Sequence, residues 1–103
     1  MAWIYLLLAG VLEIVWALAM KQSDGFTKLV PTAIMLTALV ASLVLLALAM
    51  KSLPLGTAYP IWTGIGTLGA FAVGVLLLGE PLHALRASAA AMILFGLVLM
   101  KMA

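Results

Sequence analysis

The chain has 103 residues, of which 68% are hydrophobic and 8% are charged, and its formal net charge is +2. This composition excludes a soluble domain, which needs a polar surface, and its few scattered cations exclude nucleic-acid binding. Cysteine is absent and the single histidine, His83, cannot hold a metal ion alone, so neither disulfides nor a metal site are expected. The length accommodates about four spans of the ~20 residues that cross a hydrocarbon core. We therefore expect one all-α transmembrane domain, 1–103, surrounded by lipid.

Polar clusters and helix breakers divide the sequence into four predicted transmembrane helices. They cover residues 3–20, 29–50, 57–78 and 84–100. The third helix is expected to begin near Thr57, whose hydroxyl suits an N-cap position. The fourth helix has no polar residue at its centre and is rich in small residues, which indicates a packing or dimerisation surface.

The cations are almost evenly divided between the two sides of the membrane. Because short loops make successive helices antiparallel, Lys21, Lys28 and Arg86 fall on one side, while Lys51 and Lys101 fall on the other with the N-terminal amine. The positive-inside rule then gives almost no orientation bias. This balance predicts insertion in both orientations and an antiparallel dimer; the alternative is that a single positive residue decides the orientation.

Glu13 is the deepest charge of the predicted bundle. It lies about 15 Å along the first helix at 1.5 Å per residue, near the bilayer midplane. A carboxyl group there costs at least a few kcal/mol, and such residues usually mark a path for ions, protons or substrate. The alternative is a protonated side chain that serves only as a hydrogen bond between helices.

Two helical neighbours of Glu13 suit a binding site. Gly10 is small enough to admit another helix or a ligand, and Trp16 offers an indole N–H and an aromatic face that attracts cations. Helix packing for Gly10 and lipid packing for Trp16 are the alternative interpretations. In the second helix, Ser42 is predicted to hydrogen-bond either Glu13 or the carbonyl of its own helix four residues earlier.

The third helix contributes a second group of candidate residues. Tyr59, Trp62 and Thr63 share a face at the i, i+3 and i+4 positions, where aromatic and polar groups can line a cation site. Gly64 and Gly66 follow, and they predict either a hinge or a close helix crossing.

One carboxylate per chain favours a pair of chains. Four helices scarcely enclose a cavity, whereas two antiparallel chains would bring two Glu13 side chains together near the midplane. Protons and a cation would then compete for the same carboxylates. If only the loaded and the protonated states reorient, cation export is coupled to proton entry.

Several motifs along the whole chain resemble the small multidrug resistance transporters. They are Met-Ala-Trp at 1–3, Ala-Gly-Val-Leu-Glu-Ile-Val-Trp-Ala at 9–17, Gly-Phe-Thr-Lys at 25–28, Lys-Ser-Leu-Pro-Leu-Gly-Thr-Ala-Tyr at 51–59, Trp-Thr-Gly-Ile-Gly at 62–66 and Gly-Glu-Pro at 79–81. The triplet of Gly10, Glu13 and Trp16 and the Gly-Phe-Thr-Lys loop resemble the guanidinium exporter subtype more than the subtype that exports polyaromatic cations.

The resemblance implies an antiparallel, dual-topology homodimer in the bacterial inner membrane that exchanges protons for guanidinium ion. It implies a transporter rather than an enzyme, without cofactors, driven by the proton gradient. Glu13 would be the shared proton and substrate site. Trp16 and Ser42 would hydrogen-bond and orient it, and Gly10 would keep the site open. Tyr59 would act as a gate, and Trp62 would flank the cation. The third helix would bend at residues 64–66, and the fourth helix, 84–100, would supply the dimer contact.

Pro60 departs from the family pattern, which has alanine after the tyrosine. Proline costs little if the third helix begins at Thr57, but it kinks the helix beside Tyr59 if the helix begins earlier. The altered position leaves open small substituted guanidines such as guanylurea, or a multidrug exporter of quaternary ammonium or polyaromatic cations. A heterodimer with a paralogue and a structural or regulatory membrane subunit are the remaining alternatives.

Overall fold

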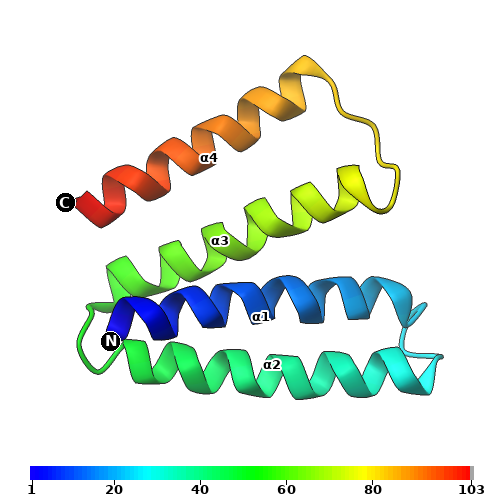
Figure 1. The fold of residues 1–103 in the computed structure, drawn as a ribbon, viewed down its shortest axis with the longest axis horizontal. Helices are drawn as coiled ribbons and strands as arrows, with labels where there is room; N and C mark the ends of the chain where they lie inside the picture. Colours follow the sequence, from blue (N-terminus) through cyan, green and yellow to red (C-terminus); the bar gives the residue numbers. More distant parts are fainter. Residues whose placement is uncertain (103) are drawn as a thin grey trace.

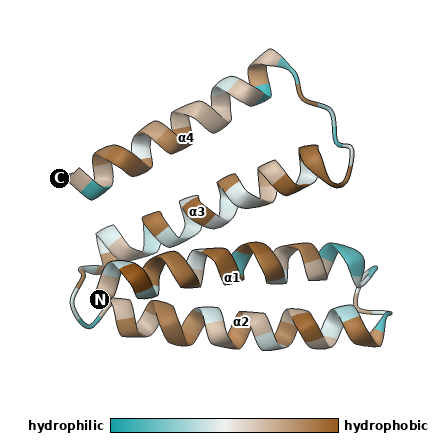
Figure 2. Ribbon diagram, in the orientation of Figure 1, coloured by the Kyte–Doolittle hydropathy of each residue, from teal (hydrophilic) through white to brown (hydrophobic). Residues whose placement is uncertain are grey.

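The computed structural model describes residues 1–102, which form four α-helices (Figure 1). These are α1 (Ala2–Gln22), α2 (Leu29–Ala49), α3 (Leu55–Leu76) and α4 (Ala84–Met102). Each helix is long and apolar enough to cross a membrane. Hydrophobic colours run along all four helices in Figure 2, while hydrophilic colours gather at helix ends and in connections. The predicted all-α fold with four potential spans is confirmed.

The helices lie side by side in a single layer. α1 lies between α2 and α3, and α4 packs on α3 (Figure 1). Near its end, α4 also places the Lys101 ammonium group over the Trp3 ring of α1, 5.3 Å from the ring centroid. The molecule measures 40 × 35 × 16 Å, so its shortest dimension is little more than the ~10–12 Å diameter of one helix with its side chains. Such a layer has two broad faces, and neither is covered by another helix of the described chain.

The buried core lies where the first turns of α1 and α3 meet the end of α2. Its members are small or apolar: Leu6, Ala9, Leu46, Ala49, Ala58, Ile61 and Trp62. Helices in lipid gain little from the hydrophobic effect, so close approach depends on small side chains. Gly10 illustrates this, because a methyl group there would overlap the Ile65 side chain of α3.

The predicted N-cap at Thr57 is wrong, because α3 begins at Leu55 and its N-cap is Pro54. Pro54 has the extended backbone of an N-cap, and its carbonyl oxygen accepts the N–H groups of Thr57 and Ala58 at 3.1 and 2.9 Å. Proline favours the start of a helix because its fixed φ matches the helical value. Pro60 consequently lies in the second turn, where it has no N–H for the Gly56 carbonyl.

α4 differs from the other three helices in its exposure. None of its described residues is buried, and large apolar side chains cover its surface. α4 packs closely on α3 at Gly64, where a methyl group would overlap Leu97. The prediction that the fourth helix offers a surface for a further partner is consistent with this exposure.

Candidate functional site

The Glu13 carboxyl group lies against the backbone of α3 at Gly66. A methyl group at Gly66 would overlap Oε1 of Glu13, so only glycine allows the carboxyl group to occupy this place. Oε1 is buried and has no hydrogen-bond partner within residues 1–102. The carboxyl group is therefore directed into the α1–α3 interface, with one oxygen free to accept a proton or a donor.

Trp16 presents the complementary group one turn further along α1. Its indole Nε1–H is buried and has no acceptor in the described part of the chain. Buried polar groups nearly always have partners, and leaving one unpaired costs about 1–3 kcal/mol. A free acceptor and a free donor thus lie within one turn of the same helix, an arrangement suited to a polar ligand.

Ser42 forms neither of the two hydrogen bonds that the sequence suggested. Its hydroxyl donates to the Ala9 carbonyl of α1 at 2.6 Å and accepts the Trp62 indole N–H of α3 at 3.0 Å. A hydroxyl has one proton, so Ser42 has none left to donate to Glu13 or to its own helix. Because the Ala9 carbonyl is the helical acceptor for the Glu13 backbone N–H, Ser42 fixes the turn of α1 that carries the carboxyl group.

The predicted stripe on α3 is divided between two environments. Trp62 is buried in the core, and its ring lies 5.4 Å from the Tyr59 ring at an interplanar angle of 59°. Tyr59 is 50% exposed and lines, with Pro60 and Thr63, a cleft of about 480 Å³ between α3 and α4. Tyr59 therefore contacts both the core tryptophan and the open cleft, whereas Thr63 faces only the cleft.

The glycines of the site support close contacts in this conformation. α3 is continuous through Gly64 and Gly66, which lie against Leu97 and Glu13 respectively. A hinge at these positions stays a prediction. Gly10 does not provide open space here, because Ile65 fills the position that a side chain would take.

The structure adds two contacts that sequence reasoning missed. Ile65 packs on Gly10, and Ile14 packs on Gly69, so that glycines of both helices admit side chains of the other. In the sequence, both contacts were indicated only by a glycine, Gly10 in the first predicted helix and Gly69 in the third. The sequence does not show which residues of different helices face one another.

The whole chain is similar to known exporters. The sequence model of a family described as Small Multidrug Resistance protein matches residues 1–100. A protein named guanidinium exporter from Escherichia coli (strain K12) is 49% identical over 102 residues, which are 99% of this chain and 97% of that protein. Proteins of the same name from Yersinia pestis and Salmonella typhi are each 50% identical, over 100% and 99% of this chain and 99% and 97% of their own lengths.

Proposed function

Since the chain belongs to the small multidrug resistance family, we propose that it exports guanidinium ion in exchange for protons. The observation that carries this proposal is the identity of about half of all residues, over the full length, to proteins named guanidinium exporter. The chain is a multi-pass protein of the bacterial inner membrane. Its function is therefore transport of a small cation across that membrane.

The arrangement around Glu13 supports a site shared by proton and cation. A guanidinium ion is planar and carries a fork of N–H donors that matches a carboxylate. The free Oε1 of Glu13 is such an acceptor, and the adjacent Trp16 offers an N–H and an aromatic face. A proton on Glu13 removes the charge that attracts the cation, so binding of one excludes the other. This competition couples the two fluxes.

An antiparallel homodimer is the assembly that we propose. A single layer 16 Å thick leaves both of its broad faces without protein, and α4 has no buried residue among those described. A second chain would cover both surfaces and supply a second Glu13. The nearly balanced cations on the two sides support opposite orientations of the two chains. A heterodimer with a paralogue is the competing assembly.

Proteoliposomes test the proposal directly. A proton gradient across the membrane should drive guanidinium accumulation in wild-type vesicles, and Glu13→Gln should abolish it. Ser88→Ala is the matched control, because Ser88 is exposed and donates only to the Ala84 carbonyl of its own helix. Uphill transport by Glu13→Gln, or tetraphenylphosphonium transport with no guanidinium response, would contradict the proposal.

Pro60 supports a wider substrate range within the same function. It lies inside α3 and lines the α3–α4 cleft beside Tyr59. We propose that small substituted guanidines are also carried. Proton-coupled currents with guanidinium, guanylurea and a small quaternary ammonium ion should respond to Pro60→Ala mainly for the larger ions. An equal change for all three ions would contradict a role in substrate range.

A further inference from the structure

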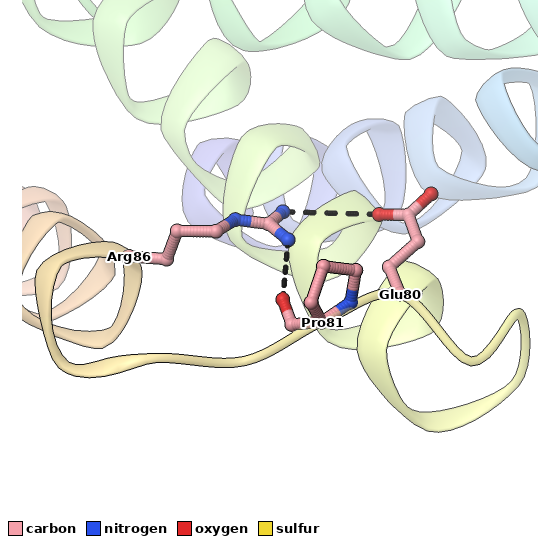
Figure 3. Close-up of polar contacts among 3 residues, drawn as sticks. All are labelled: Glu80, Pro81 and Arg86. Carbon is pink, nitrogen blue, oxygen red and sulfur yellow. Dashed lines mark hydrogen bonds and ion pairs between the residues drawn. The ribbon is translucent and has the colours of Figure 1, made fainter.

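The guanidinium group of Arg86 forms an ion pair with the carboxylate of Glu80 where the chain passes from α3 to α4. Arg86 donates through Nη1 to the Pro81 carbonyl at 2.5 Å, and its Nη2 lies 3.7 Å from Oε1 of Glu80 (Figure 3). The guanidinium carbon is 5.1 Å from the centroid of the Phe71 ring. The site thus combines a carboxylate, a carbonyl oxygen and an aromatic face, which are the groups that bind guanidinium ions in proteins.

The backbone holds Glu80 in this site independently of Arg86. Gly79 has a φ of +69°, which turns the chain back after α3, and the Glu80 N–H donates to the Gly74 carbonyl at 3.0 Å. A methyl group at Gly74 would overlap the Glu80 carboxyl group, which therefore lies directly on the α3 backbone. These contacts of Glu80 do not involve Arg86.

Glu80 also lines a cavity that extends along α1 as far as Ile14, the residue that follows Glu13 in the sequence. The cavity measures about 150 Å³, and its lining includes Lys21 and Glu80 near the helix ends and Ile14 and Ala17 further in. A water occupies ~30 Å³ in the liquid, so the cavity has room for a small hydrated cation. Gly74 and Gly66, on which the two carboxyl groups lie, are separated by roughly 12 Å along α3.

We propose that Glu80 is an outer subsite for guanidinium. Arg86 occupies this subsite in the absence of substrate, and the substrate displaces Arg86 from Glu80 before it reaches Glu13. This inference rests on the proposed function. Arg86 and the substrate carry the same head group, so they compete for one carboxylate. The Arg86–Glu80 pair is suited to displacement, because its side chains are 33% and 42% exposed and such pairs are weak. Lys21 opposes a cation in the cavity.

If Arg86 and the substrate compete for Glu80, substitutions of Arg86 and of Glu80 should change the apparent KM for guanidinium in opposite directions. Arg86→Gln should lower the apparent KM for guanidinium by roughly two- to fivefold, and Glu80→Gln should raise it by a similar factor. The maximal rate should change little in either variant, and the double variant should behave like Glu80→Gln alone. Lys21→Gln should lower KM, and Ser88→Ala should leave it unchanged. A purely structural ion pair would shift KM in the same direction in both single variants, which would overturn the proposal.

A binding measurement separates this inference from the proposed function. Guanidinium chloride is titrated into Glu13→Gln/Arg86→Gln protein and into the same protein carrying Glu80→Gln as well. The first should retain weak binding at Glu80, and the second should lose it. Equal binding by the two proteins would overturn the subsite, whether or not the wild-type protein transports. Absence of guanidinium transport by the wild-type protein would instead contradict the proposed function.

Discussion

Glycines at the α1–α3 contact have a neighbouring side chain packed on them, whereas the space beside Gly96 of α4 is open. At that contact, Gly10, Gly66 and Gly69 each receive a side chain of the opposite helix, and one of these side chains is Glu13. On α4, nothing lies within 4 Å of the position that a side chain at Gly96 would occupy. Because helices in lipid associate through close packing rather than the hydrophobic effect, a filled glycine marks a completed interface. Gly96 instead lines the open cleft between α3 and α4, which a helix of a second chain would fill in the proposed dimer.

The largest effect is expected at Gly66. Gly66→Ala places a methyl group where Oε1 of Glu13 lies, so the carboxyl group must move out of the α1–α3 interface. Overpacking of this kind costs about 1–3 kcal/mol, and we expect guanidinium exchange to fall by roughly tenfold or more. Initial rates in proteoliposomes measure the change. Ser88→Ala is the control, because its hydroxyl is exposed and donates only to its own helix, and a wild-type rate for Gly66→Ala would refute the placement of the carboxyl group.

A smaller effect is expected at Ser42, which joins three helices through its hydroxyl. Ser42→Ala removes the bond to Ala9 and leaves the buried Trp62 N–H without an acceptor, so the free energy of unfolding should fall by about 2 kcal/mol. Denaturant titration in detergent measures this change. Ser88→Ala should stay within about 0.5 kcal/mol of wild type because its hydroxyl is exposed. Equal stability of the two variants would argue against the bridge.

The surface of α4 should affect assembly rather than folding. Gly96→Ala adds a methyl group that has no atom of its own chain within 4 Å, so the helix content measured by circular dichroism should not change. If α4 contacts a second chain, the added side chain should weaken dimerisation by about fivefold, near the lower end of overpacking costs. Chemical crosslinking at graded protein-to-lipid ratios measures the dimer fraction. An unchanged dimer fraction would place the interface elsewhere.

The sequence predicts the spans because each depends on a continuous run of apolar residues, and it singles out Glu13 because a charge within such a run is costly. Eighteen or more apolar residues require a helix, and a carboxyl group at the midplane is costly wherever its neighbours lie. The partners of Ser42 could not be predicted, because they depend on the rotation of α2 relative to α1 and α3. The start of α3 was missed because Pro54 and Thr57 are both acceptable near a helix start, and the backbone of Pro54 decides between them.

The central claim is that a proton and a guanidinium ion compete for Glu13. Calorimetric titration of guanidinium in two buffers of different ionisation enthalpy counts the protons released on binding. The account predicts proton release by the wild-type protein, with the release lost and the binding greatly weakened in Glu13→Gln. Tight guanidinium binding without proton release, or proton release that persists in Glu13→Gln, would contradict it.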